Sequence, residues 1–118
     1  MNNSTKFKAD PYNFSNHLLQ DSDILKIMDT LQIKNHKIYN IKYYQRAFIH
    51  KSYTKLKDYE EYEKPDNCLP LFELSYETME FLGDSILGSV VCSYLYERFY
   101  KVYEQNEGFL TYLKNRIV

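Results

Sequence analysis

The sequence lacks several features that mark whole classes of protein. In 118 residues it has no tryptophan, three glycines, three prolines and two cysteines, Cys68 and Cys92. Two cysteines are too few for the disulfide framework of a small secreted domain, so we expect an intracellular, cytoplasmic protein with Cys92 as a small core residue. No apolar run reaches the roughly 18 residues of a membrane-spanning helix, and the N-terminus lacks the apolar centre of a signal peptide. We therefore expect no membrane partner.

A large net charge of either sign is also lacking, because 15 basic residues nearly offset 16 acidic ones and leave a formal net charge of −1. No strong overall field would hold a nucleic acid, so a polyanionic partner would need a local patch or another domain. Aromatic side chains are abundant, with 13 tyrosines and 7 phenylalanines. Two interpretations stay open: biased coding sequence, which we favour, and a surface on which bases stack. Three aromatic residues at helical spacing are interpreted as core or interface residues: Tyr94, Tyr96 and Phe99.

The spacing of apolar residues predicts helices along the whole chain and no strand. Residues 1–18 are polar and aperiodic, which is typical of an arm that becomes ordered only by docking. Helices are predicted over residues 21–34, with Asp21 or the serine after it as the N-cap, and over residues 41–53. Residues 54–70 then form a charged loop, whose unusual length is typical of a functional or disordered segment.

The second half of the chain contains two further predicted helices. One covers residues 75–100 and is apolar on more than one side, so we expect it to be central and buried. Gly83 and Gly88 within it each cost a helix about 1 kcal/mol relative to alanine, a penalty tolerated where another backbone or a ligand comes close. The other helix begins at residue 106, and its inward side chains are expected to be Leu110, Leu113 and Ile117. At this length the chain forms one domain at most.

Three acidic residues recur at helical spacing inside the otherwise apolar segment 75–100. Glu77, Glu80 and Asp84 stand at positions i, i+3 and i+7 and therefore share one stripe of the predicted helix. Like charges four residues apart cost a helix about 0.2–0.5 kcal/mol, and a divalent cation is the simplest way to offset that repulsion. The alternative is a solvated or salt-bridged stripe, as for most helical carboxylates. Because apolar residues flank the acids on both sides, we favour metal ligation.

Four segments of the chain, in order, resemble the ribonuclease III family. The sequence YETMEFLGDSIL at residues 76–87 resembles the family signature, in which an acid and two variable residues precede Glu-Phe-Leu-Gly-Asp. AFIHKSY at residues 47–53 is similar to its Ala-x-x-His-x-Ser-Tyr segment, and YLYERF at residues 94–99 resembles the end of the signature helix. EGFLTYLK at residues 107–114 is similar to its Glu-Gly-x-Leu-(Thr/Ser)-x-Leu-(Lys/Arg) segment. Four ordered matches over roughly residues 41–118 are a strong signal.

The resemblance implies an all-α, ribonuclease III-like endonuclease domain. Such a domain would hydrolyse double-stranded RNA with Mg²⁺, or with Mn²⁺ as a substitute, and would act as a homodimer paired through the signature helix. Glu80 and Asp84 match the family's metal carboxylates and are the implied catalytic and metal-binding residues. Glu77, Gly83 and Glu107 match positions beside the substrate valley or the dimer contact.

The chain also departs from the family pattern. It stops at Val118, before the place where the family puts a second acidic pair, so residues 19–118 are expected to be the N-terminal part of the domain, incomplete at its C-terminus. The 118-residue fragment alone is then expected to have little or no activity. Tyr76 stands where many members have asparagine, Ile49 replaces a common threonine, and the loop at residues 54–70 is longer than expected.

Other functions stay open for the same residues. The fold could serve a catalytically silent relative that binds RNA, or a helical dimerisation module with no RNA role. Retention of Glu80 and Asp84 favours the nuclease, since a silent relative has no metal reason to keep both. His50 is interpreted as a core or capping histidine rather than a metal ligand. Three lysines near it either contact phosphates or form a solvated basic face: Lys51, Lys55 and Lys57.

Overall fold

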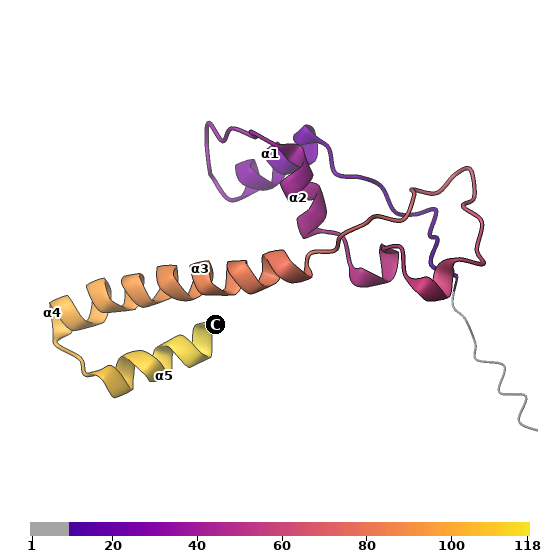
Figure 1. The fold of residues 1–118 in the computed structure, drawn as a ribbon. Helices are drawn as coiled ribbons and strands as arrows, with labels where there is room; N and C mark the ends of the chain where they lie inside the picture. The colour runs from indigo at the N-terminus through magenta and orange to yellow at the C-terminus, as the bar shows by residue number, and fades with distance from the viewer. Residues whose placement is uncertain (1–9) are drawn as a thin grey trace, which may run out of the picture. The chain divides into compact units, whose positions relative to one another are not determined.

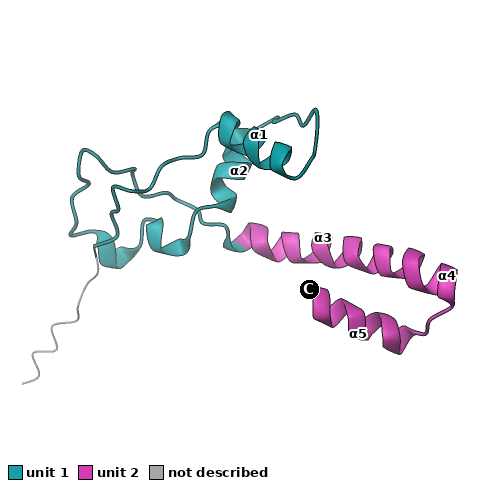
Figure 2. Cartoon of the chain, turned by 180° about the vertical axis from the view of Figure 1, so that it is seen from behind, with its two compact units in different colours: residues 1–77 teal, residues 78–118 magenta. Residues whose placement is uncertain are grey.

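The computed structural model describes residues 10–118, and the chain divides into two compact units, the first ending at Glu77 and the second running from Thr78 to the last residue (Figure 2). Over the described residues the regular structure is helical, and the β pairing is limited to an isolated parallel bridge between Thr54 and Phe72. The predicted all-α fold class is confirmed. In this described part, no helix is both long enough and apolar enough to cross a membrane.

The first unit begins its regular structure with α1 (Asp21–Thr30). A carboxylate oxygen of Asp23 accepts a hydrogen bond from the amide of Gln20 at 2.8 Å, which makes Gln20 the N-cap. The prediction of Asp21 or the following serine as the cap is wrong, because both residues are already helical. The carboxylates of Asp21 and Asp23 lie in the first turn, where they favour the positive end of the helix dipole.

The C-terminus of α1 is a Schellman motif. The amide of Ile33 donates to the carbonyl oxygen of Met28 at 2.9 Å, and Gln32 between them takes a left-handed backbone with φ of 59°. The helix therefore ends at Thr30, and the predicted end at residue 34 is wrong. Glycine is the usual residue at such a position, so a glutamine there gives no stop signal in the sequence.

The helix predicted over residues 41–53 is divided in two. The structure has α2 (Ile41–Ala47) followed by a short 3₁₀-helix, η1 (Lys51–Tyr53). The side chain of His50 begins the second piece, because its Nδ1 accepts a hydrogen bond from the amide of Ser52 at 3.1 Å. The interpretation of this histidine as a capping residue is confirmed, and the same cap explains why one continuous helix does not form.

The long charged loop after η1 has its two ends held together. The amide of Phe72 donates to the carbonyl oxygen of Tyr53 at 3.1 Å, next to the bridge between Phe72 and Thr54. Tyr53 is buried, and its hydroxyl donates to the carbonyl oxygen of Leu69 at 2.9 Å. A second 3₁₀-helix, η2 (Lys57–Tyr59), forms inside the loop. The loop thus begins and ends at neighbouring positions of the first unit.

The predicted N-terminal arm, residues 1–18, is described only in part, because residues 1–9 lie outside the described residues. The ring of Tyr12 lies edge-on to the ring of Tyr53, with 6.3 Å between their centroids. This contact agrees with ordering by docking. The division of the chain into an arm and a domain stays a prediction.

The second unit is a helical hairpin (Figure 1). It is built from α3 (Glu77–Leu95), which continues through the π-helical segment η3 (Tyr96–Tyr100) into the short α4 (Lys101–Tyr103). The chain then reverses, and α5 (Glu107–Ile117) runs back alongside α3. Both helices predicted in the second half of the chain are confirmed.

The hairpin is held at its closed end by large side chains. Leu95 is 2% exposed, and the ring of Phe99 packs against that of Phe109 with 5.7 Å between centroids. The ring of Tyr96 stacks on that of Tyr100 at 4.9 Å within the same helical segment. The contact between Phe99 and Phe109 agrees with the interpretation of Phe99 as a packing residue, whereas Tyr94 and Tyr96 are exposed in this chain.

Burial along α3 differs from the prediction. Its apolar side chains are largely exposed in this chain, and Cys92, predicted as a core residue, is exposed as well. A single antiparallel partner covers one side of a helix, whereas α3 is apolar on more than one side. The prediction of a central, buried helix is therefore wrong for these residues. In α5, Leu110 and Leu113 are half-buried as predicted, but Ile117 is exposed.

Candidate metal-binding helix

The residues that precede α3 are fixed by the end of α2 and the start of η1. The amide of Tyr76 donates to the carbonyl oxygen of Ile49 at 2.9 Å, and the Nε of Arg46 donates to the carbonyl oxygen of Ser75 at 3.0 Å. The rings of His50 and Tyr76 lie 5.9 Å apart. The segment at residues 47–53 therefore contacts the start of the signature segment, although twenty-odd residues separate them in sequence.

The local sequence favours a helix beginning at Glu77. The hydroxyl oxygen of Ser75 accepts a hydrogen bond from the amide of Glu77 at 3.2 Å and so satisfies one donor of the first turn. Glu77 and Glu80 then place negative charge near the positive end of the helix dipole. The helix runs unbroken through Gly83, whose backbone has no positive φ.

Glu80 and Asp84 occupy successive turns of α3. Residues four apart lie on one face and are separated by about 6 Å along the helix axis. Both side chains are exposed, so a cation held between them would keep water in its remaining coordination positions. Their carboxylate oxygens are the donors that a hard divalent cation prefers. The pair therefore fits part of a Mg²⁺ or Mn²⁺ coordination shell.

The structure does not complete that shell within the chain. Over the described residues, no group of three or more histidine, cysteine, aspartate or glutamate side chains could hold a metal ion. Glu77 is exposed one turn before Glu80 and shares its stripe. A cation bound at Glu80 and Asp84 would need further ligands from water, from substrate phosphates or from other acidic residues.

Gly83 leaves open space beside the acids. A Cβ placed on Gly83 would meet no heavy atom within 4 Å, and the same holds for Gly88. No described part of the chain makes the close approach that the sequence suggested for these glycines. Their role in admitting a ligand or a second backbone stays a prediction.

Glu107 lies at the other end of the hairpin. It begins α5, and its Oε1 accepts a hydrogen bond from the hydroxyl of Thr111 at 2.9 Å. Phe99 packs against Phe109 at the closed end of the hairpin, near Glu107. About 22 Å of helix separates Asp84 from Phe99. The structure thus does not bring Glu107 together with Glu80 within one chain, and its predicted place beside the substrate valley stays a prediction.

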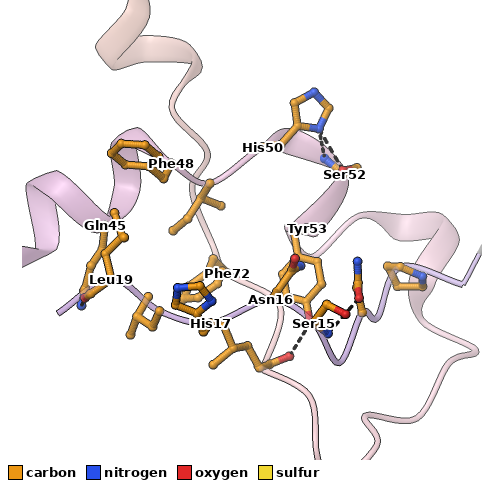
Figure 3. A pocket seen from close by; sticks show the side chains of 15 residues that line it. Ser15, Asn16, His17, Leu19, Gln45, Phe48, His50, Ser52, Tyr53 and Phe72 are labelled. Atoms are coloured by element: carbon orange, nitrogen blue, oxygen red, sulfur yellow. Dashed lines mark hydrogen bonds between the residues drawn. The ribbon is translucent and has the colours of Figure 1, made fainter. Parts of the chain in front are cut away.

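The first unit contains a cavity that sequence reasoning missed. It has a volume of about 490 Å³ and lies between the described part of the arm and the segment after α2. Figure 3 shows side chains from both segments around it, with His50 turned toward Ser52. Its lining carries amide, hydroxyl and imidazole groups but no carboxylate, which argues against a Mg²⁺ site there. Residues 11–19 show no apolar period, so no sequence signal could have predicted this wall.

Burial affects one titratable group of the cavity wall. It raises the pKa of the Tyr53 phenol above its ordinary value, because the ionised form would lose contact with water. The neutral hydroxyl is kept as the donor to Leu69. Tyr53 thus serves the fold through its buried ring and this hydrogen bond.

Comparison with curated proteins gives several relatives with one name. The chain is 41% identical over 75 residues to the ribonuclease 3 of Zunongwangia profunda, a match that covers 64% of this chain and 25% of that protein. It is 39% identical over 79 residues to the ribonuclease 3 of Lactobacillus acidophilus, covering 67% and 28%. It is 42% identical over 82 residues to the ribonuclease 3 of Leptospira interrogans, covering 70% and 27%.

These matches cover most of this chain but a small part of each relative. The chain spans between 25% and 30% of the length of the first curated relatives that it matches. No family model matches the sequence. No solved structure matches it.

Proposed function

The chain is related to the ribonuclease III family, and we propose that it supplies the first metal carboxylates of an endonuclease that hydrolyses double-stranded RNA. One observation carries the proposal. Glu80 and Asp84 stand one turn apart on an exposed stripe of α3, inside the segment that resembles the family signature. Relatives named ribonuclease 3 support the class of reaction.

The chemistry of the reaction explains why two carboxylates belong there. Hydrolysis of a phosphodiester needs an activated water and compensation for the charge that develops on the phosphate oxygens, and a bound divalent cation supplies both. Glu80 and Asp84 would hold Mg²⁺, with Mn²⁺ as a substitute, and leave several of its positions open. Two carboxylates are too few to fix the cation alone, so we expect the isolated 118 residues to have little or no activity.

We further propose that α3 pairs with the α3 of a second copy. Its uncovered face carries large apolar side chains that are at least half exposed: Leu82, Ile86, Leu87, Val90 and Tyr94. Apolar surface of this kind on a helix is typical of an interface. A dimer would also bring two pairs of carboxylates into one assembly, as cutting both strands of a duplex requires. A cytoplasmic location belongs to the same proposal.

Binding of Mn²⁺ followed by NMR tests the metal site directly. In ¹H–¹⁵N spectra of the chain, a small amount of Mn²⁺ is expected to broaden the amide signals of Gly83 and Ser85, which flank Asp84. Glu80→Gln is expected to weaken this broadening. Glu97→Gln is the matched control, because Glu97 is an exposed carboxylate of the same helical run, already paired with Lys101. Equal broadening in both variants would contradict the assignment.

A dimerisation module with no RNA role is the main alternative. The exposed face of α3 suits such a module equally well, so self-association alone does not separate the two functions. Cleavage of a duplex by the longer protein does. Absence of metal binding at Glu80, together with absence of duplex cleavage by the parent, would favour the dimerisation module.

A further inference from the structure

Basic residues are gathered in one part of the first unit. All 16 acidic residues of the chain lie outside residues 30–57, which we call the basic segment. The segment contains seven cationic residues: Lys34, Lys37, Lys42, Arg46, Lys51, Lys55 and Lys57. The near-zero net charge of the chain therefore hides a local positive field of the kind that attracts polyanions.

Exposed aromatic rings accompany these charges. Tyr39 is 91% exposed just before the N-cap of α2, Tyr43 is 63% exposed on the helix one turn later, and Phe48 is 66% exposed at its C-cap. Asn40 fixes the start of the helix, since its Oδ1 accepts from the amide of Lys42 at 3.0 Å. Large rings left this open on a short helix are not needed for the core of the unit.

The cationic residues of the basic segment divide into two groups. Lys55 pairs with Glu73, and Arg46 donates to the carbonyl oxygen of Ser75, so both serve the fold. Lys37 and Lys42, in contrast, are exposed and form no ion pair with any described residue. Lys37 stands two residues before Tyr39 and Lys42 one residue before Tyr43, so exposed charges and exposed rings alternate along the segment.

We infer that the basic segment binds single-stranded nucleic acid. Unpaired bases stack on Tyr39, Tyr43 and Phe48, and the phosphates between them contact Lys37 and Lys42. The phosphates of a duplex would contact the lysines, but its bases would make no stacking contact with the rings, because they are already stacked on one another. An acidic peptide would pair with the lysines but would make no stacking contact with the rings. The residues of this surface belong to the first unit and Glu80 and Asp84 to the second, and the inference does not depend on the proposed nuclease.

Fluorescence anisotropy with labelled oligonucleotides tests the inference on the 118-residue chain. The probes are a uridine dodecamer, a thymidine dodecamer and a hairpin duplex of equal charge. Tyr39→Ala and Tyr43→Ala are each expected to weaken single-strand binding about five-fold or more, while Tyr39→Phe keeps it. Phe14→Ala is the matched control, since Phe14 is 73% exposed in the same unit but outside the basic segment.

The salt dependence tests the contribution of charge. The slope of log affinity against log salt for single strands is about −0.7 per phosphate contact, so Lys42→Gln is expected to flatten it by about that amount. Lys26→Gln, on α1 among acidic residues, is expected to leave it unchanged. Glu80→Gln is expected to leave binding unchanged, which separates this site from the nuclease.

Several results would decide against the inference. They are an unchanged affinity in the tyrosine-to-alanine variants, tighter binding of the duplex than of the single strands, or tighter binding of a polyglutamate peptide or of anionic lipid vesicles. Equal binding of the uridine and thymidine probes supports the site and shows that it does not read the 2′-hydroxyl.

Discussion

The backbone amide of Tyr76 donates a hydrogen bond to the carbonyl oxygen of Ile49 across 2.9 Å. This bond joins two segments that resemble the family pattern, at the two positions, Tyr76 and Ile49, where we interpreted the sequence as departing from that pattern. The contact uses main-chain atoms on both sides, so it does not depend on which side chains stand at these positions.

We expect Asp84→Asn to reduce duplex cleavage by the longer protein at least tenfold. The amide keeps the shape of the carboxylate but removes the charge that attracts a divalent cation. Cleavage of a labelled duplex at fixed Mg²⁺ measures the effect, with Glu97→Gln as a control that keeps wild-type rates. Undiminished cutting by Asp84→Asn would remove this residue from the metal site.

Asn106→Ala is expected to destabilise the hairpin by about 1 kcal/mol. The Oδ1 of Asn106 accepts a hydrogen bond from the amide of Phe109 at 3.0 Å and caps α5. Urea unfolding followed by far-UV circular dichroism measures the loss. Asn115→Ala, at an exposed position inside the same helix, is expected to change stability by less than about 0.5 kcal/mol. Equal effects of the two substitutions would show that the cap is not formed in solution.

A charge on the uncovered face of α3 is expected to dissociate the proposed dimer. Ile86 is exposed on that face in the single chain, and burying a glutamate there without a partner opposes association. Sedimentation velocity at several concentrations of Ile86→Glu is expected to show monomers where the wild type shows dimers. Asn115→Glu, exposed on α5, provides a control of equal charge. Dimers that persist in Ile86→Glu would place the interface elsewhere.

Tyr53→Phe is expected to destabilise the first unit by about 1 kcal/mol, because the carbonyl oxygen of Leu69 loses its buried donor. Burial raises the pKa of Tyr53, so the folded chain holds this proton more tightly than the unfolded chain, whose tyrosines ionise near pH 10. The stability from Tyr53 is therefore present below about pH 10 and is lost above it. Above about pH 10, the difference in free energy of unfolding between the wild type and Tyr53→Phe should therefore become smaller.

Urea unfolding at pH values on both sides of about 10 measures that gap. Tyr39→Phe is the control, because Tyr39 is exposed and contributes no buried hydrogen bond. A gap between wild type and Tyr53→Phe that widens with rising pH would contradict the burial of this phenol.

The sequence predicted those elements whose causes are local. The course of α3 followed from apolar spacing, and the isolation of His50 from other metal-binding side chains led to its interpretation as a core or capping residue, of which the structure shows the cap. The end of α1 could not be predicted, because Gln32 takes the left-handed backbone that usually marks a glycine. The exposure of Cys92 depends on which face α5 covers, and no property of α3 alone decides that.

The candidate site was predictable to a similar degree. The spacing of Glu80 and Asp84 fixes their common face, and the structure adds that both are exposed. The distance of Glu107 from them could not be predicted, because it depends on the direction in which the hairpin closes. The concentration of charge in the basic segment was present in the sequence but was hidden by the sum over the whole chain.

The paired ends of the long loop explain how the chain can carry it at little cost. With Thr54 and Phe72 bridged, residues can be added to or removed from the loop between them without moving either flank. Each doubling of such a loop adds only about 0.6 kcal/mol of closure entropy. The loop is therefore a suitable site for an insertion. A peptide tag or a fluorophore inserted within this loop is expected to leave the bridge between Thr54 and Phe72 in place.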